Sequence, residues 1–542
     1  MTNLPKTYKA VQLVGPDKLE LNESKELYEP GPHQILCRVE AVGLCFSDLK
    51  LLKQFSSHIR KSEIVSGIKL DVLKEIPSYV PGDAPAVPGH EAVVRIEAAG
   101  PGVENFKPGE RYLVQTDYRW LRTATGSNAA FGYNIEGALQ EYVLMDERVF
   151  TSPEGQSMML PVGEELSGSA IALVEPWACV EDAYASKERV GIKENGQMLV
   201  VAEKDVTEDS LGDLFEHYGR PAKITRISVS QIFDLPDAAY DDIVYFGFLP
   251  EAVEGLFAKV AANGLLNIVL RGRKLGRDII TMVGRVHYGG IRIIGTTGSN
   301  PAESMETIPE TGEIRPGDKI NVVGAGGPMG LMHVVRNICQ GVKNISVYGS
   351  DVDDNRLATL EKIAAPLAKQ NNVEYESFNP TKGKSKVAFD YTALMAPVPA
   401  LVAAAVRESA ERGIINIFAG IPATVTGEID IDAYIEKRLY FIGTSGSTLD
   451  DMKRMLSKVE SGRLDTNLSV AAVSGLDGAT DGIRAVENRL IAGKIVVYPS
   501  CKGLGLTRLK ELKDKLPEVA KCLKNGFWTV QAEKKLLEIF GH

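Results

Sequence analysis

Cysteine pairs and long apolar runs are what this sequence lacks. Its six cysteines are spread over 542 residues with no C-x-x-C spacing among them. That spread excludes a dense disulfide framework and favours free thiols in a reducing compartment. No apolar run approaches the roughly 18 residues of a membrane span, and the first residues, MTNLPKTYKA, lack the basic-then-apolar pattern of a signal peptide. We therefore expect a cytoplasmic protein with no membrane partner.

An excess of positive charge is also absent. The formal net charge is −10 at pH 7. Phosphate backbones and anionic lipid surfaces repel such a chain, so nucleic acid is not an expected partner. Hydrophobic residues make up 44% of the sequence, which is enough for a large core shared among several domains.

Two sequence patterns divide the chain. Residues 7–49 and 88–150 alternate apolar and polar positions between Gly- and Pro-rich turns, which predicts a β-rich, barrel-like domain. Residues 54–86 interrupt this pattern as a long, partly helical excursion. From about residue 196, apolar strands alternate with helical segments, which is typical of a parallel sheet covered by helices. The predicted fold class is therefore α/β.

The α/β region contains an internal repeat. Four segments recur in the same order: QMLVVAE with KINVVGA, VAANGLLNIVLRG with SAERGIINIFAG, RIIGTTGS with YFIGTSGS, and ESM with DDM. The shared order favours duplication over chance similarity of glycine-rich strand ends. After its first strand the second copy has the glycine turn GAGGPMG, whereas the first has the acidic VAEKDVTEDSLG. Because acidic side chains repel phosphate and block its approach, we expect one cofactor-binding copy and one degenerate copy.

These patterns divide the chain into five predicted segments. They are 1–190, the first part of the barrel domain; 196–305, a degenerate Rossmann-like domain; 316–450, a nucleotide-binding Rossmann domain; 451–500, a return to the barrel domain; and 501–542, a C-terminal helical extension.

The glycine turn of the second copy predicts a dinucleotide site. Glycines between a strand and a helix let the backbone meet a pyrophosphate, and the helix N-terminus adds amide donors. The candidate residues of this turn are Gly324, Gly326, Gly327, Pro328, Met329 and Gly330. The next strand ends at Asp351, twenty-one residues after Gly330, where a carboxylate accepts hydrogen bonds from ribose hydroxyls and repels a 2′-phosphate. NAD is therefore favoured over NADP. The turn is one residue longer than G-x-G-x-x-G, and a turn that only packs a helix is the alternative interpretation.

Three short segments carry side chains suited to a metal ion. They are GLCFSDLK (43–50), PGHEAVV (88–94) and VEPWACV (174–180). Thiolate, imidazole and carboxylate are zinc ligands, and a catalytic zinc ion keeps one position open. Taken singly, such a cysteine is more often a small buried apolar residue, and such a histidine is more often a loop residue with its hydrogen bonds satisfied. Together with the glycine turn they resemble the zinc-containing medium-chain dehydrogenase/reductases, over roughly 1–190 and 319–500.

The resemblance implies a GroES-like β-barrel and roles for individual residues. The internal repeat adds a second α/β copy that the family's ordinary architecture lacks, so we expect two tandem Rossmann-like, doubly wound parallel-sheet domains beside the barrel. The resemblance implies metal ligands Cys45, His90 and Glu175, catalytic residues Ser47, Asp48 and Glu91, and nicotinamide-side cofactor residues Gly443, Thr444 and Ser445. Ser47 would pass on the proton of the substrate hydroxyl, and Asp48 would orient the histidine ligand. Glu91 would lie beside the metal. For the Gly/Ser-rich loop at 443–447, a plain strand exit is the alternative.

Several departures from the family pattern shape the expectations. Lys50 stands where a relay histidine is common, and residues 105–145 contain no cysteine, so one catalytic zinc ion and no structural zinc are expected. The 54–86 excursion is expected to form a lid. Since relatives dimerise by joining outer strands, we expect the two copies to pair internally as a pseudo-dimer, in a chain that is a monomer or a homodimer.

Within the family, GYNIEGALQEYV, GGPMG and GTSGSTLDDM are most similar to sorbose-1-phosphate reductase and related enzymes acting on polyol phosphates. The predicted function is zinc-dependent hydride transfer between NAD(H) and the secondary alcohol or ketone of a polyol, sugar or sugar phosphate. Two alternatives stay open. One is an epimerase or lyase that retains NAD and oxidises its substrate transiently. The other is a non-catalytic, nucleotide-binding regulatory protein.

Overall fold

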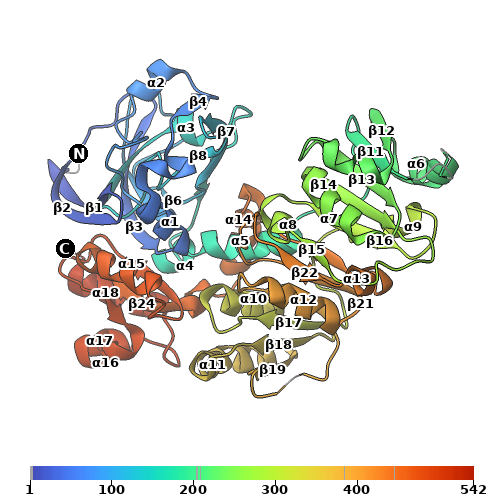
Figure 1. Cartoon of the computed structure of the whole chain (residues 1–542). Helices are drawn as coiled ribbons and strands as arrows, with labels where there is room; N and C mark the ends of the chain where they lie inside the picture. Colours follow the sequence, from blue (N-terminus) through green and yellow to red (C-terminus); the bar gives the residue numbers. More distant parts are fainter. Residues whose placement is uncertain (1–3, 203–205, 208, 384, 445, 542) are drawn as a thin grey trace. The chain divides into compact units, whose positions relative to one another are not determined.

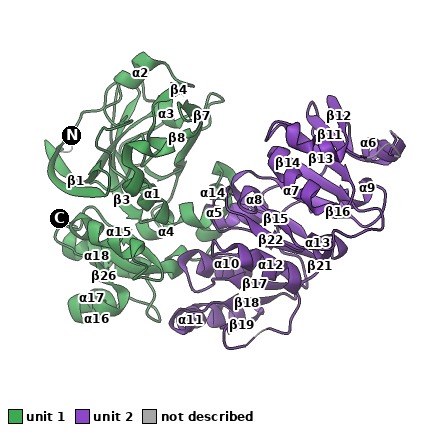
Figure 2. Cartoon of the chain, viewed as in Figure 1, with its two compact units in different colours: residues 1–178, 447–542 green, residues 179–446 purple. Residues whose placement is uncertain are grey.

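The computed structural model describes residues 4–202, 206–207, 209–383, 385–444 and 446–541. Contacts divide the chain into two units, residues 1–178 with 447–542 and residues 179–446 (Figures 1 and 2). Among the described residues, no helix has both the length and the apolar character needed to cross a membrane.

The first unit is built on a mostly antiparallel sheet of eight strands in the order β10-β6-β5-β3-β25-β24-β26, with β9 also paired to β3. Its strands are β3 (Gln34–Gly43), β5 (Glu91–Ala99), β6 (Arg111–Val114), β9 (Tyr142–Asp146), β10 (Met159–Pro161), β24 (Val470–Ser474), β25 (Lys494–Val497) and β26 (Thr507–Arg508). Two smaller sheets pair β1 (Thr7–Gly15) with β2 (Lys18–Glu26), and β7 (Asp117–Thr123) with β4 (Ile64–Ser66) and β8 (Asn128–Ala130).

The first unit also contains helices. They are α1 (Phe46–Gln54), α2 (Leu70–Lys74), α3 (Glu147–Phe150), α4 (Gly168–Ala172), α14 (Leu449–Glu460), α15 (Ala479–Glu487), α16 (Leu512–Lys515), α17 (Pro517–Ala520) and α18 (Val530–Phe540). The central strand β3 is buried over most of its length because it pairs with β5, β9 and β25. In the register of β3 with β5, Gly43 lies opposite Glu91. Two segments that carry chemistry in the sequence therefore meet at one end of this sheet.

The excursion at 54–86 folds into two short 3₁₀ turns, β4 and α2. Its anchor is Lys61, whose buried ammonium group donates to the carbonyls of Val80 and Ala84. The carbonyl of Lys61 in turn accepts from the amide of Gly82. These bonds close the excursion on itself.

The second unit contains two parallel sheets. Their orders are β12-β11-β13-β14-β16 and β19-β18-β17-β20-β21-β23. The first copy consists of β11 (Gln197–Val201), α6 (Gly212–Tyr218), β12 (Lys223–Ile227), β13 (Tyr240–Phe246), α7 (Pro250–Lys259), β14 (Val260–Val269), β15 (Ile279–Thr281), α8 (Gly284–Tyr288), β16 (Arg292–Thr296) and α9 (Ala302–Met305). The second consists of β17 (Lys319–Val323), α10 (Pro328–Cys339), β18 (Ser346–Ser350), α11 (Asp354–Asn371), β19 (Glu374–Phe378), β20 (Phe389–Leu394), α12 (Pro399–Glu408), β21 (Ser409–Asn416), β22 (Gly427–Ile429), α13 (Ile431–Glu436) and β23 (Tyr440–Ile442).

The two copies follow the same path. When β11 is matched to β17, each strand of the first sheet has a counterpart in the second, and β19 is the additional strand. Strands β14 and β21 each contain a residue in the left-handed region, Asn263 at φ 58° and Arg412 at φ 59°, followed by Gly264 and Gly413. An irregularity repeated at the same position is further support for duplication.

The copies share one apolar core, with buried side chains from both sheets in a single cluster. Strand β15 pairs antiparallel with β22, and β16 contacts β23. The guanidinium group of Arg292 in β16 makes two bonds to Glu188, which also accepts from the hydroxyl of Tyr440 in β23. The segments 196–305 and 316–450, which the sequence patterns predict as separate domains, thus form one unit in the structure. They do so because each buries its apolar surface against the other. The unit boundaries at 178 and 447 lie near the sequence-based limits of 190 and 451, and the first falls within α5 (Val174–Ala185).

Candidate functional site

Three side chains at the end of the large sheet of the first unit form a candidate metal site. Cys45 is the residue before α1, His90 is the residue before β5, and Glu91 is the first residue of β5. One donor atom from each of the three lies within 4.8 Å of the other two. His90 and Glu91 are buried and Cys45 is half-buried. Sulfur, nitrogen and oxygen donors at this separation suit Zn²⁺.

The carboxylate of Asp48 orients this cluster. Its Oδ1 lies 3.0 Å from Nδ1 of His90, and its Oδ2 accepts a hydrogen bond of 3.0 Å from the amide of Cys45. Although burial opposes charge on the imidazole, the nearby Asp48 carboxylate raises the pKa of His90 above its usual value. With Nδ1 donating to Asp48, the other ring nitrogen is left to face the metal site.

The hydroxyl of Ser47 lies between two of the donors. Its Oγ is 3.1 Å from Sγ of Cys45 and 3.2 Å from Nε2 of His90. The structure therefore brings together all three of the predicted residues at 45, 47 and 48. A hydroxyl in this position can exchange a proton with a group bound at the same place.

Glu91 has a carboxylate with one paired and one unpaired oxygen. Its Oε1 accepts from the ammonium group of Lys494 at 2.5 Å, and that lysine also donates to the carbonyl of Leu44. Its Oε2 is buried with no hydrogen-bond partner in the part of the chain that the structure describes. A Cβ at Gly43 would lie 2.0 Å from this oxygen, so only glycine leaves room for the carboxylate. A buried oxygen without a partner, beside a thiol and an imidazole, fits a metal ligand.

Glu175 lies in the first turn of α5 and is buried, but its carboxylate is outside the group of three donors. Burial raises its pKa to about 7; His90 lowers it and the Glu91 carboxylate raises it. The resemblance implied Glu175 as the third ligand and Glu91 as its neighbour. In the structure Glu91 is within the donor group and Glu175 stands beside it.

Sequence reasoning missed several residues around this site. Lys494 is the first residue of a buried apolar strand. A lysine is unusual in such a place, and this is the sequence feature that could have identified it as part of the site. The ring centroid of Tyr133 lies 5.9 Å from that of His90 and 5.1 Å from that of His58. No spacing rule links these aromatic residues to the histidine, because they come from separate loops.

The glycine turn of the second copy links β17 to α10. Gly324 has φ 84°, and a Cβ at Gly330 would lie 2.3 Å from the Gly324 carbonyl oxygen, so close backbone packing requires both glycines. Gly327 precedes the helix and has no side chain to cap it, and Pro328 is the first helical residue. The first-turn amides, such as that of Met329, have no intrahelical acceptor. This helix end therefore suits an anionic phosphate group. The corresponding turn of the first copy includes Glu203, Lys204, Asp205 and Glu208, which lie outside the described residues.

Asp351 directly follows β18 and hydrogen-bonds to the glycine turn. Its Oδ2 accepts a bond of 2.9 Å from the amide of Gly326, and its Oδ1 accepts one of 3.0 Å from the amide of Asp353. A Cβ at Gly326 would lie 2.4 Å from Cβ of Arg356. The predicted acidic residue is thus in contact with the turn, and a cation that the sequence analysis did not select lies beside it.

The loop after β23 contains the remaining predicted residues. Oγ1 of Thr444 is buried and finds no hydrogen-bond partner within the described ranges. A Cβ at Gly443 would lie 2.9 Å from Cα of His287, so glycine is required by close packing there too. Ser445 lies outside the described residues. An unpaired buried hydroxyl at the carboxyl end of a parallel strand fits a place where a cofactor binds.

Comparison with known proteins places these sites in context. Residues 31–154 match the family model of the alcohol dehydrogenase GroES-like domain. The chain is 29% identical to uncharacterized protein YggP of Escherichia coli K12 over 46% of its own length, and 26% identical to L-sorbose 1-phosphate reductase of Klebsiella pneumoniae over 41%. These matches span 63% and 56% of the two relatives, less than two thirds of either.

The fold is also found among solved structures. The crystal structure of 2R,3R-butanediol dehydrogenase from Bacillus subtilis superposes with a TM-score of 0.54 at 16% identity, covering 91% of this chain and all of that one. The matched domain and the dehydrogenase relatives confirm the resemblance found in the sequence, and the shared fold agrees with it. Residues 31–154 thus match a domain of alcohol dehydrogenases, and the chain is similar over part of its length to dehydrogenases of the medium-chain family.

Proposed function

We propose that this protein is a zinc-dependent oxidoreductase that transfers a hydride between NAD(H) and the secondary alcohol or ketone of a polyol, sugar or sugar phosphate. The observation that carries the proposal is the convergence of Cys45, His90 and Glu91, with the Asp48 carboxylate behind the imidazole. A purely structural role would not require a thiol, an imidazole and an unpaired carboxylate oxygen at one place.

The chain's own residues would handle binding and the proton. When bound, zinc supplies Lewis-acid stabilisation of the substrate oxygen and NAD supplies the hydride acceptor. Ser47 is placed to take the proton of the substrate hydroxyl, since its Oγ lies among the donors. Asp48 keeps His90 in one tautomer by accepting from Nδ1.

We propose Cys45, His90 and Glu91 as the zinc ligands, with Glu175 as the competing third ligand. The unpaired Oε2 of Glu91 supports this order. The zinc content of purified Glu91→Gln and Glu175→Gln proteins tests it. Loss of zinc in the first variant alone supports Glu91, and loss in the second alone supports Glu175.

NAD is the proposed cofactor, bound at the turn Gly324–Gly330. The carboxylate of Asp351 lies under this turn and would repel a 2′-phosphate. Binding of NAD⁺ and NADP⁺ to the same preparation, measured by calorimetry, tests the preference. Tighter binding of NADP⁺ would contradict it.

The substrate class rests on the relatives. L-sorbose 1-phosphate reductase is among them by name, so we propose polyols, sugars and their phosphates. All six cysteines are free thiols, which is consistent with the cytoplasmic location we propose.

The decisive experiment is a screen of these compounds for NAD⁺ reduction, with and without a zinc chelator. We expect turnover that the chelator abolishes and that Cys45→Ser lacks. Turnover that survives both treatments would refute the zinc mechanism. Product formation without net NADH would instead indicate an epimerase or lyase, and absence of both metal and turnover would indicate a binding protein.

A further inference from the structure

The two α/β copies contact each other through equivalent short helices. Helix α8 precedes β16 in the first copy, and α13 precedes β23 in the second. His287 is eight positions before Gly295, and Ile435 is eight positions before Gly443 (295 − 287 and 443 − 435). By the repeat, His287 and Ile435 therefore occupy the same position of the duplicated unit.

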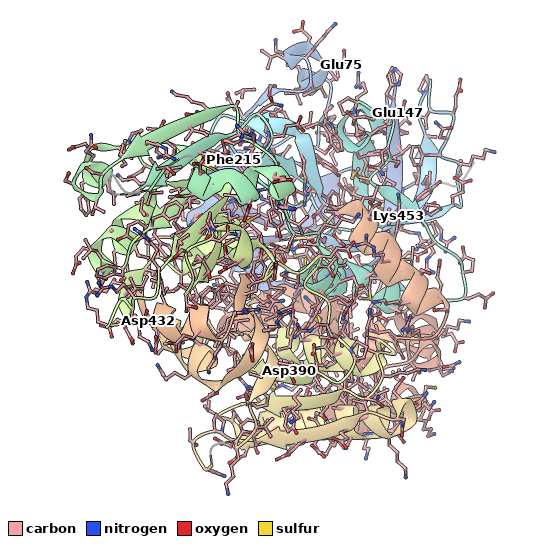
Figure 3. The ribbon with its side chains drawn as sticks, turned by 90° about the vertical axis from the view of Figure 1, so that its right-hand side faces the viewer. Glu75, Glu147, Phe215, Asp390, Asp432 and Lys453 are labelled. Carbon is pink, nitrogen blue, oxygen red and sulfur yellow. The ribbon has the colours of Figure 1, made fainter. Side chains whose placement is uncertain are left out.

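The contacts cross from one copy to the other. A Cβ at Gly295 would lie 2.6 Å from Cδ1 of Ile435, and a Cβ at Gly443 would lie 2.9 Å from Cα of His287. Each helix thus packs on the strand-end glycine of the opposite copy. The same holds one turn earlier. Asp432 in α13, labelled in Figure 3, accepts from the amides of Leu275 and Gly276, and its counterpart Gly284 in α8 lies against the 421–422 backbone.

The chemistry of these equivalent contacts differs. The helix that faces the degenerate copy presents isoleucine. The helix that faces the copy with the glycine turn presents His287, which is buried and has Nδ1 3.1 Å from the carbonyl oxygen of Ile417. Since a carbonyl only accepts, Nδ1 donates this bond. The next residue, Tyr288, lies over the same loop, because a Cβ at Gly420 would be 2.6 Å from its hydroxyl oxygen.

The segments that α8 contacts belong to one half of the cofactor site. The second sheet has the order β19-β18-β17-β20-β21-β23, the 3-2-1-4-5-6 order of sheets that bind a dinucleotide across the carboxyl ends of their strands. Because the glycine turn follows β17, the adenosine half of a bound dinucleotide would lie over β17–β19 and the nicotinamide half over β20, β21 and β23. Ile417 directly follows β21 and Gly443 directly follows β23.

We propose that His287, supplied by the first α/β copy, is a positioning residue for the nicotinamide half of the cofactor site in the second. The first copy lacks the glycine turn and serves as the fixed support of the loops at 417–422 and 443–444. This inference rests on the proposed use of NAD. In this role the degenerate copy supports the cofactor site of the neighbouring copy, whereas a Rossmann domain ordinarily binds a nucleotide itself.

The test compares two ligands on the full chain. NAD⁺ occupies both halves of the site, whereas ADP-ribose lacks the nicotinamide ring. Calorimetry would measure the Kd of both ligands for wild type and two variants. His287→Ile introduces the residue found at the equivalent position of the other copy. His287→Asn keeps an amide that can still donate to Ile417. Ile435→Ala, at the mirrored contact, is the matched control.

We expect His287→Ile to raise the Kd for NAD⁺ by roughly 5- to 10-fold, the scale of one hydrogen bond, with the Kd for ADP-ribose unchanged. His287→Asn should stay within about 2-fold of wild type for both ligands. Ile435→Ala should lower the melting temperature and leave both Kd values unchanged.

Two results would overturn the inference. One is wild-type affinity for NAD⁺ in His287→Ile. The other is equal weakening of NAD⁺ and ADP-ribose, which would indicate general loss of structure. If the wild-type chain bound neither ligand, the proposed function itself would fail, and that result is distinct from both.

Discussion

The ammonium nitrogen of Lys494 lies 2.5 Å from Oε1 of Glu91, and both side chains are buried. The two residues are 403 positions apart in the sequence. Removing one partner of a buried ion pair leaves the other charge uncompensated, at a cost of about 3–5 kcal/mol. A divalent cation bound beside Glu91 would restore that compensation.

We therefore predict that Lys494→Met destabilises the protein strongly in the presence of a chelator and much less in the presence of zinc. Thermal unfolding in EDTA and in Zn²⁺ measures both. Lys25→Met is the control, because Lys25 forms a largely buried pair with Glu136 at 2.5 Å and neither residue belongs to the donor group. Its deficit should be the same in both conditions. An equal deficit for Lys494→Met in EDTA and zinc would contradict the prediction.

Substitution at Gly43 should damage the metal site directly. The added methyl group of Gly43→Ala would lie 2.0 Å from Oε2 of Glu91, so the carboxylate must move. We expect the affinity for Co²⁺, measured as a zinc substitute by its absorption spectrum, to fall by about 10-fold or more, the scale of a 1–3 kcal/mol overpacking cost. Gly163→Ala adds a methyl group into open space and should bind as wild type does. Unchanged Co²⁺ binding in Gly43→Ala would exclude Glu91 as a ligand.

The C-terminal helix α18 should be integral to the first unit. The carboxylate of Glu533 accepts from the amides of Gly168 and Ser169 at the start of α4 and from the hydroxyl of Tyr498. Glu533→Ala leaves these buried donors unpaired, so we expect a loss of about 2–5 kcal/mol in stability. Glu538→Ala on the same helix breaks only an exposed pair with Lys535 and should cost less than about 1 kcal/mol. Similar unfolding curves for the two variants would show that α18 is not anchored by Glu533.

Lys61 should make stability depend on pH in the alkaline range. Burial lowers its pKa from 10.5 to about 8. Below pH 8 the lysine is charged in both states, and the folded state bears the cost of burying that charge. Between about pH 8 and 10.5 the unfolded chain binds the proton that the folded lysine has released, so stability rises with pH.

Relative to Lys61→Met, wild type should therefore gain up to about 3 kcal/mol between pH 7 and 10.5, the equivalent of the shift in pKa. Denaturant unfolding of both proteins at a series of pH values measures the difference. Lys74→Met, at an exposed position, is the control and should show no such trend. A flat difference for Lys61→Met would mean that the buried ammonium keeps its ordinary pKa.

We also predict that the chain is a monomer. Strands β16 and β23, one from each copy, already contact each other, and β15 already pairs with β22. The edges through which two separate subunits would join are thus occupied within one chain. Sedimentation equilibrium should give the mass of a single chain across the micromolar range. A stable dimer would require a different surface.

Local patterns in the sequence were sufficient to predict much of the fold of this protein. The glycine turn and the repeat could be predicted from the sequence alone. A residue such as Gly324, with φ 84°, is required by a backbone conformation that depends on only a few neighbouring positions of the chain. The roles of Cys45, Ser47 and Asp48, which lie together at the start of one helix, came from the family resemblance. The same resemblance joined them to His90.

Only the tertiary structure decided which carboxylate shares the donor group, and what surrounds it. Glu91 rather than Glu175 lies with Cys45 and His90 because of the register of β3 with β5, which a sequence pattern does not specify. The pairing of Glu91 with Lys494 and the contact of His287 with Ile417 depend on strands and helices that meet across hundreds of residues or between two copies of one fold. Such contacts follow from burial of apolar surface over the whole chain, and no local spacing encodes them.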